Sequence, residues 1–297
     1  MGIKRGIIQS RGLGDIIIAL PIAKWYADQG DTIYWPICRE FIGSFERSVP
    51  WVQWIPMDTD AQGQFFFNTP LSILEDLGCD QDEILYLYQF LNVRPDLTDP
   101  ELFNILKFDQ YKYWVSQVPF RRKWTLADCI QRDPVREQAL YDQVVGSTRD
   151  YAVAHLEGSN FKARVDLSFL DPAVVFTIDP SLSSSIFDWL MILEHATSFV
   201  GVDSVFANLV DSLSLPIENL YWIRRSGWDL TPVLGSAWTI VPTDLPIVDP
   251  RRVDPARMAQ EFKARTAAPA DHGTMKSHAP FQASGTIPTS FMSALKK

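Results

Sequence analysis

Residues 7–15 read IIQSRGLGD and join an apolar strand to a glycine turn and to an acidic residue at the start of a helix. The acid is Asp15, and Gly12 and Gly14 bracket the turn before it. Glycine tolerates positive φ and lets a ligand approach the backbone amides at a helix start. The apolar residues that follow the acid are Ile16, Ile17, Ile18, Leu20 and Ile22. The stretch therefore predicts a polar pocket at the carboxyl end of the first strand.

Strand-like and helix-like patterns alternate along most of the chain. Strand patterns cover 4–9, 32–35, 52–56, 83–88, 151–156, 174–178, 199–202 and 217–223. Helix patterns cover 15–29, a short stretch near Glu40, 70–77, 99–117, 136–145, 183–195 and 204–213. In the helix at 99–117, the residues expected to face inward are Phe103, Leu106, Tyr113 and Trp114. This alternation predicts an α/β protein whose parallel sheets are flanked by helices.

A length of 297 residues is more than one ordinary core needs, and the alternation starts afresh after Gly146. We expect one Rossmann-like domain at 1–148, a second at 149–250, and a C-terminal part at 251–297. That last part holds a helix pattern at 254–265 and then a tail rich in Ala, Pro, Ser and Gly, which is predicted to be mobile or loosely docked. Gly146 is the predicted hinge.

The composition is typical of a globular protein. Apolar residues make up 46% of the chain, yet no uncharged apolar run is long enough to span a membrane, and we expect a cytoplasmic location. Cys38, Cys79 and Cys129 are odd in number and widely spaced, which indicates buried thiols. A net charge of −9 argues against nonspecific nucleic-acid binding through a uniformly basic surface.

Metal ligands are not indicated by the sequence. The histidines are His155, His195, His272 and His278, and they show no ligand spacing. Asp58 and Asp60 form a DxD pattern, but the neighbouring Gln62 and Gly63 favour a solvated turn. We therefore expect no metal site.

A second polar turn lies at 199–208, which read FVGVDSVFAN. A short strand delivers Asp203 and Ser204 to the first turn of an apolar helix, and Asn208 lies one turn further on the same face. The unpaired amides at a helix start suit an anion, and the serine adds a hydroxyl donor. This turn predicts a phosphate-binding site.

A third polar turn lies at 157–162, which read EGSNFK. Open α/β sheets bind ligands in loops at the carboxyl ends of their strands. In this loop Ser159 offers a hydroxyl, and Lys162 offers a cation that can neutralise a departing diphosphate.

Two alternatives apply to the first turn. A dinucleotide fingerprint fails on spacing, because GxGxxG needs a small residue where Ile17 stands and no acid ends the second strand at 34–36. In the other alternative Asp15 only caps its helix, a common use of acidic residues. Ser204 has the same alternative, and both stay open at this point.

The order of the three turns resembles the GT-B glycosyltransferases, and most closely the ADP-heptose heptosyltransferases of glycosyltransferase family 9. Residues 14–21, GDIIIALP, are similar to that family's GD turn with its following Leu-Pro. Residues 159–162 are similar to its Thr/Ser-x-x-x-Lys loop, one residue shorter. Residues 203–209 are similar to its D-[ST]-G-x-x-H-L block, with Val205 in place of glycine and Asn208 in place of histidine. The start GLGDIIIALPIA also resembles uncharacterised phage-encoded proteins.

The resemblance implies two Rossmann-like domains facing across a cleft, the GT-B architecture. It implies inverting, metal-independent transfer of a hexosyl or heptosyl group from a nucleotide-sugar to an acceptor hydroxyl, with Asp15 as general base. The donor-binding candidates are Ser159, Lys162, Asp203, Ser204 and Asn208. The acceptor-side candidates are Arg11, Gly12, Gly14 and Trp35. The nucleotide-sugar is a co-substrate, so no cofactor is expected.

The acceptor and the reaction have alternatives. The acceptor is a glycan, or a hydroxymethylated base of phage DNA bound along a basic groove walled by Arg121, Arg122 and Lys123. A sugar-nucleotide epimerase or hydrolase would use the same donor site. A noncatalytic sugar-binding protein would fit if Val205 and Asn208 mark a decayed donor site.

Overall fold

The computed structural model describes residues 2–60, 64–88, 106–158, 161–170, 174–224 and 231–241. The helix predicted at 254–265, the tail after it, Phe103 and the candidate site residue Ser159 lie outside these ranges. Within them, strands and helices alternate along the chain as the sequence patterns predict.

The first half forms a four-stranded parallel sheet in the order β3-β2-β1-β4. Its strands are β1 (Lys4–Ile8), β2 (Thr32–Cys38), β3 (Val52–Met57) and β4 (Ile84–Tyr86). Its helices are α1 (Leu13–Ala27), α2 (Ile42–Phe45), α3 (Asn68–Asp76) and α5 (Phe108–Val115), with 3-10 turns η1 (Arg39–Phe41), η2 (Gln64–Phe66) and η3 (Gln81–Glu83).

The second half forms a five-stranded parallel sheet in the order β11-β10-β9-β5-β8. Its strands are β5 (Ala152–His155), β8 (Val175–Thr177), β9 (Ser198–Val202), β10 (Asn219–Ile223) and β11 (Trp238–Val241). The helices around it are α6 (Pro134–Val144), α7 (Leu190–Glu194) and α8 (Val205–Leu213), with 3-10 turns η6 (Pro180–Leu182) and η7 (Ile186–Trp189). The 3-10 turns η4 (Phe120–Trp124) and η5 (Leu126–Cys129) contact both α1 and α8. After β5, the short strands β6 (Glu157–Gly158) and β7 (Phe161–Lys162) form an antiparallel pair.

Each sheet has a point where its strand order reverses. In the first sheet β1 lies between β2 and β4, so the chain proceeds outward on one side of β1 and then returns to the other side. In the second sheet β5 lies between β8 and β9 in the same way. Open α/β sheets bind ligands at such switch points, at the carboxyl ends of the strands. The fold thus marks the ends of β1 and β4, and of β5 and β9, as places for a site.

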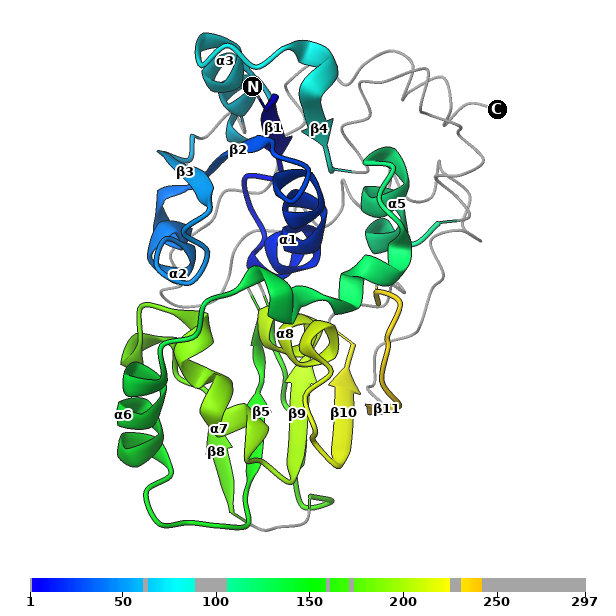
Figure 1. The fold of residues 1–297 in the computed structure, drawn as a ribbon. Helices are drawn as coiled ribbons and strands as arrows, with labels where there is room; N and C mark the ends of the chain where they lie inside the picture. The colour runs from blue at the N-terminus through cyan, green and yellow to red at the C-terminus, as the bar shows by residue number, and fades with distance from the viewer. Residues whose placement is uncertain are drawn as a thin grey trace.

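Helix α1 is buried almost all round, because it lies between the first sheet and helix α8 of the second half (Figure 1). A helix that is apolar on every side is a buried helix, and Ile16, Ile17 and Ile18 are each 0% exposed. One buried apolar cluster runs from these residues through Phe206 and Leu209 of α8. The two sheets therefore share a packed core where α1 meets α8. The α/β class with parallel sheets is confirmed, and the GT-B arrangement of two domains across a cleft stays a prediction.

Several elements differ from the predictions. The helix expected at 183–195 is a 3-10 turn, η7, followed by the short α7, and β11 was not predicted. Helix α5 begins at Phe108, and Trp114 is 41% exposed instead of facing inward. The inward face of α5 carries Asp109, Lys112 and Tyr113, so the next residue along the helix points outward.

Helix α6 packs against the second half, although it precedes the predicted domain boundary at residue 148. Arg132, just before α6, pairs with Glu194 of α7, and Arg136 of α6 pairs with Asp188 of η7, with an Nη2–Oδ2 distance of 2.8 Å. Figure 1 shows α6 beside α7. These contacts group α6 with the second sheet, and the division of the chain into domains stays a prediction.

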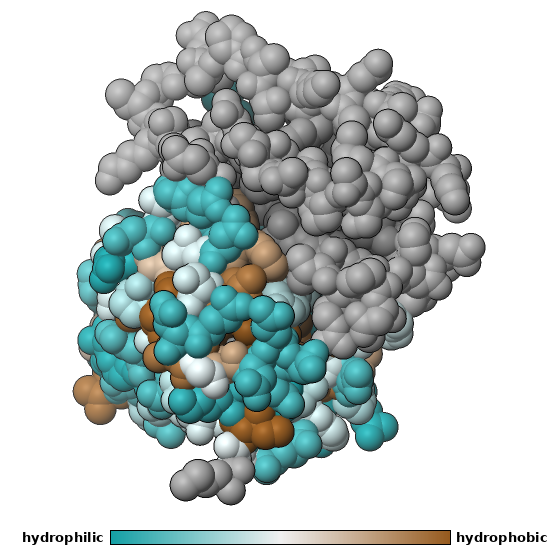
Figure 2. All heavy atoms as spheres, turned by 90° about the horizontal axis from the view of Figure 1, so that it is seen from above, coloured by the Kyte–Doolittle hydropathy of each residue, from teal (hydrophilic) through white to brown (hydrophobic). Residues whose placement is uncertain are grey.

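Hydrophilic side chains cover most of the coloured surface seen from above in Figure 2, with smaller hydrophobic areas between them. The apolar residues of the central strands lie inside, as Ile7 and Ile8 of β1 are 0% and 1% exposed. Among the described residues, no helix is both long and apolar enough to cross a membrane.

Candidate functional site

Two helix starts carry the polar residues that the sequence singled out. In the first half, β1 leads into a turn in which Gly12 has φ +84°, and α1 begins at the next residue. Only a residue without a Cβ adopts such a φ freely, so the glycine is required by this turn. Asp15 then lies in the first turn of α1. In the second half, β9 ends at Val202, and Ser204 is the N-cap residue of α8.

The two helix starts touch each other at Gly14. A Cβ placed on Gly14 would lie 2.9 Å from Asn208 Nδ2 and 3.5 Å from Val205 N and the carbonyl carbon of Ser204. The two backbone atoms would be at ordinary van der Waals distance from that Cβ, so the glycine mainly leaves room for the Asn208 side-chain amide. The structure therefore brings Gly14 of the first turn next to Ser204, Val205 and Asn208 of the second.

The Asp15 carboxylate has two different surroundings. Its Oδ1 lies 3.0 Å from Lys112 Nζ of helix α5, an ion pair in which the lysine side chain is 3% exposed and the aspartate side chain 38%. Its Oδ2 lies against Gly12, where a Cβ would come within 2.7 Å of that oxygen. The Asp15 side chain therefore has an ionic partner, Lys112, that does not depend on helix capping.

Lys112 is held at the carboxyl ends of β1 and β4. Its ammonium donates to Gln9 Oε1 at 2.6 Å and to the Leu87 carbonyl oxygen at 3.0 Å. Gln9 follows β1 and Leu87 follows β4, so the ammonium lies at the switch point of the first sheet. Gln9 is itself fixed, because its Nε2 donates to the Arg11 carbonyl oxygen at 2.8 Å.

The switch point of the second sheet carries a serine and a histidine. Ser204 Oγ lies 2.8 Å from Nδ1 of His155, the last residue of β5. Burial of the imidazole lowers the pKa of His155 to about 4, although the charge of Glu157 opposes this shift. The ring is therefore neutral at physiological pH, and either Ser204 or His155 is the donor, depending on the tautomer.

The other donor-side candidates are placed as follows. Asp203 is 7% exposed, and its backbone N–H donates to Ile223 O. Asn208 is 4% exposed, and its Nδ2 donates to Ser204 O at 2.9 Å. Asn208 Oδ1 has no hydrogen-bond partner among the described residues. Lys162 is exposed and paired with Glu157 across the β6–β7 pair.

The acceptor-side candidates divide into two kinds. Arg11 is partly exposed beside the turn, with its guanidinium 3.8 Å from Glu40 and 5.5 Å from the ring centre of Phe65. Trp35, in contrast, is 0% exposed and donates from its indole N–H to Gln9 O at 3.1 Å. The expectation that Trp35 faces an acceptor is wrong, because a fully buried ring has no face for a sugar to stack on.

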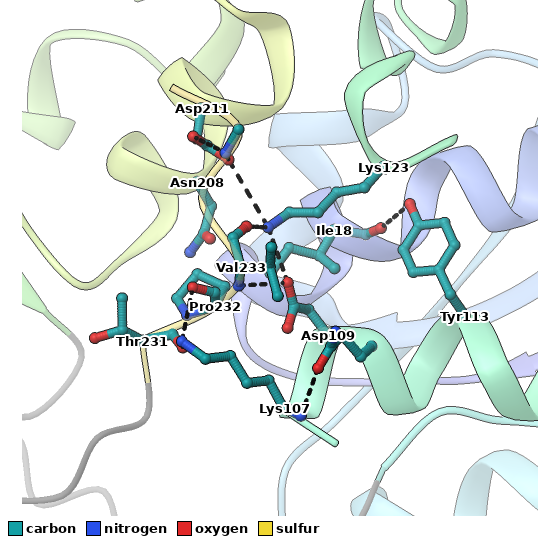
Figure 3. A network of polar contacts seen from close by, with 12 residues as sticks. Ile18, Lys107, Asp109, Tyr113, Lys123, Asn208, Asp211, Thr231, Pro232 and Val233 are labelled. Atoms are coloured by element: carbon teal, nitrogen blue, oxygen red, sulfur yellow. Dashed lines mark hydrogen bonds and ion pairs between the residues drawn. The ribbon is translucent and has the colours of Figure 1, made fainter. Parts of the chain in front are cut away.

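The basic cluster at 121–123 is divided, because Arg121 is exposed and Arg122 is partly buried, whereas Lys123 is buried. Lys123 is 0% exposed, and its ammonium lies 2.9 Å from Asp109 of α5 and 3.8 Å from Asp211 of α8 (Figure 3). Its third partner is the Val233 carbonyl oxygen. The expectation of an exposed cluster is therefore wrong for Lys123, which instead joins segments of both halves.

Both carboxylates of the DxD pattern accept hydrogen bonds from residues of the first half. Asp58 accepts from Arg39 Nε at 2.8 Å, which lowers the pKa of that carboxyl. Asp60 accepts from the backbone N–H groups of Gln64 and Phe65, each at 3.0 Å, at the start of η2. No group of three or more metal-ligating side chains is found among the residues the structure describes.

Three polar residues of this site were not predicted as site residues. The sequence does not predict Lys112 as a site residue, because its partners lie on other elements. Its own helix pattern shows only a lysine among aromatic residues. His155 shows no metal-ligand spacing in the sequence, but its place at the end of a strand and before a polar loop is a signal of a binding site. Tyr88, whose pKa is raised by burial, accepts from the Arg11 N–H at 2.8 Å and so fixes the turn from the end of β4.

Comparisons with known proteins give a structural likeness at low sequence identity. No protein-family model matches the chain, and no curated protein matches it. Among solved structures, it is similar to the bacterial iron-containing dodecameric glycosyltransferase TibC from enterotoxigenic E. coli H10407, with 12% sequence identity and a TM-score of 0.45. The match covers 83% of this chain and 65% of that chain, so the chain spans just under two thirds of its neighbour's length.

Proposed function

We propose that the protein is an inverting, metal-independent glycosyltransferase that moves a sugar from a nucleotide-sugar to an acceptor hydroxyl. The observation that supports it is the meeting at Gly14 of two polar turns, one bearing Asp15 and the other Ser204, each beside the switch point of its sheet. A transferase needs a base and a leaving-group site within reach of one reacting centre, and this junction supplies a carboxylate beside a helix start.

In this proposal the acceptor oxygen attacks the anomeric carbon of the donor while its proton passes to the Asp15 carboxylate. The bond between the anomeric carbon and the diphosphate oxygen breaks, and the nucleoside diphosphate leaves with that electron pair. A positioned base speeds such a step by about 10²- to 10⁴-fold.

The leaving group gains negative charge as its bond to the sugar breaks. The N-terminal amides of α8 and the Ser204 hydroxyl are the proposed partners of that charge, because a helix start favours an anion. Lys162 is a further proposed partner, which must exchange Glu157 for the diphosphate. A glycan is the proposed acceptor, since the burial of Lys123 weakens the case for a basic DNA groove at 121–123.

The first experiment is a thermal-shift screen of the full chain with UDP-, GDP-, ADP- and TDP-sugars. We expect at least one to raise the melting temperature, and the stabilising donor is then incubated with glycan acceptors and, separately, with hydroxymethylated DNA. No stabilisation by any nucleotide-sugar would overturn the proposal. Sugar products formed without an acceptor would indicate an epimerase or hydrolase instead.

The second experiment tests the base. Asp15→Asn keeps the shape of the side chain but removes its basicity, so we expect at least a 100-fold loss of transfer with the thermal shift by the donor retained. The matched control is Asp28→Asn, which changes the exposed acid at the other end of α1 and is expected to leave transfer unchanged. If Asp15→Asn abolishes folding, Asp15 is a structural residue and not the base.

A further inference from the structure

Lys112 is a buried lysine with a complete set of acceptors. Its ammonium is 3.0 Å from Asp15 Oδ1, 2.6 Å from Gln9 Oε1 and 3.0 Å from Leu87 O. An ammonium has three protons to donate, so each proton has one acceptor. These acceptors come from α1, from the residue after β1 and from the residue after β4, which fixes the ammonium from three directions.

The same arrangement makes the two oxygens of Asp15 unequal. Oδ1 faces an ammonium that is almost entirely buried, whereas Oδ2 faces Gly12, where the missing Cβ leaves room beside it. The side chain of Asp15 is 38% exposed although its partner lysine is 3% exposed, so the exposed part of the pair is the carboxylate. Holding one oxygen leaves the other free to meet a substrate in a fixed direction.

We infer that Lys112 is a positioning residue that holds Asp15 Oδ1 and thereby presents Oδ2 as the oxygen that takes the acceptor's proton. This inference rests on the proposed transfer reaction, in which Asp15 is the base. Lys112 itself touches no substrate in this role. Its ammonium is fully used by three protein acceptors, so it acts through the carboxylate it holds.

The test is a double-mutant cycle with Asp15→Asn, Lys112→Met and the two combined, each in the full chain. If Lys112 acts through Asp15, Lys112→Met lowers kcat by about 10- to 100-fold with little change in the donor KM, and it causes no further loss in the Asp15→Asn background. A merely structural lysine would lower activity by the same factor in both backgrounds, and that additivity would overturn the inference.

Lys112→Arg supplies a second measurement that does not depend on the folding of the methionine variant. It keeps the charge but changes the hydrogen-bond geometry beside Asp15, so we expect it to lower kcat relative to the wild type and to cause no further loss in the Asp15→Asn background. Equal effects of Lys112→Arg in the two backgrounds would also overturn the inference. The matched control is Lys24→Met, on the exposed end of α1, which is expected to leave kcat unchanged.

The two proposals fail in different ways. Absence of transfer by the wild-type chain, with every donor and acceptor tested, would overturn the proposed function and the role of Lys112 with it. Measurable wild-type transfer with additive losses in the cycle would overturn the role of Lys112 alone.

Discussion

His155 shows at the scale of one residue how burial creates a dependence on pH. The ring is 5% exposed, and burial lowers its pKa to about 4, whereas an unfolded histidine titrates near 6.5. Between these two values the unfolded chain binds more protons than the folded one. The contribution of His155 to the free energy of unfolding is therefore largest above about pH 6.5 and falls as the pH drops toward 4.

The pH dependence that His155 contributes to the free energy of unfolding can be measured. Between pH 6.5 and pH 5, His155 should account for a loss of about 2 kcal/mol in the free energy of unfolding, at about 1.4 kcal/mol per pH unit. Urea denaturation at several pH values measures it, and in His155→Phe the loss over this window should shrink by that amount. His195→Gln changes an exposed histidine and is the control. An unchanged pH dependence in His155→Phe would contradict the prediction.

At the scale of elements, α1 and α8 meet where Gly14 lies beside the Asn208 side-chain amide. In Gly14→Ala the new Cβ would lie 2.9 Å from Asn208 Nδ2, inside a buried contact. Alanine improves helix propensity by about 1 kcal/mol, but overpacking a core costs about 1 to 3 kcal/mol. We expect the cost of crowding to exceed the gain in helix propensity. The free energy of unfolding should then fall by about 1 kcal/mol, as measured by urea denaturation.

A matched glycine provides the control for this second prediction. Gly43 lies in α2, where a Cβ would only reach ordinary contact, 3.5 Å from Ser184 O. Gly43→Ala should therefore not destabilise the protein. Combining Gly14→Ala with Asn208→Ala removes the crowded amide and should recover part of the stability that the single change loses. Equal effects of Gly14→Ala and Gly43→Ala would show that α1 and α8 are not held as closely as described.

The elements also show what a sequence pattern can predict. β1 and α1 were predicted to within about two residues of their bounds, because apolar periodicity and glycine turns are local signals. The proximity of Ser204 to His155 was not predictable, because it depends on β9 lying beside β5 in the sheet. Lys112 could not be assigned for the same reason, since its acceptors are distant in the chain. The site residues on turns were thus recognisable, and their partners were not.

At the scale of the whole molecule, the two sheets are tied together by charges as well as by apolar packing. Lys123, between the halves, contacts Asp109 of α5 and Asp211 of α8, and all three side chains are almost completely buried (Figure 3). Asp211 also accepts from Gly235 N–H and from the indole N–H of Trp238, each at 2.9 Å, which fastens the segment before β11. The basic residues at 121–123 thus include a lysine at a buried junction, because the carboxylates that pair with Lys123 lie on the distant helices α5 and α8.

The last prediction concerns this junction. Lys123→Met leaves two buried carboxylates without their ammonium, and removing one partner of a buried ion pair costs about 3 to 5 kcal/mol. We expect urea denaturation to show a loss of that size, because the same lysine contacts both α5 and α8. Adding Asp109→Asn and Asp211→Asn should restore part of the stability, since the uncompensated charges are then removed. Arg121→Met, on the exposed neighbour, is the control. A loss in Lys123→Met no larger than in Arg121→Met would mean that packing of α1 on α8, and not this network, joins the two halves.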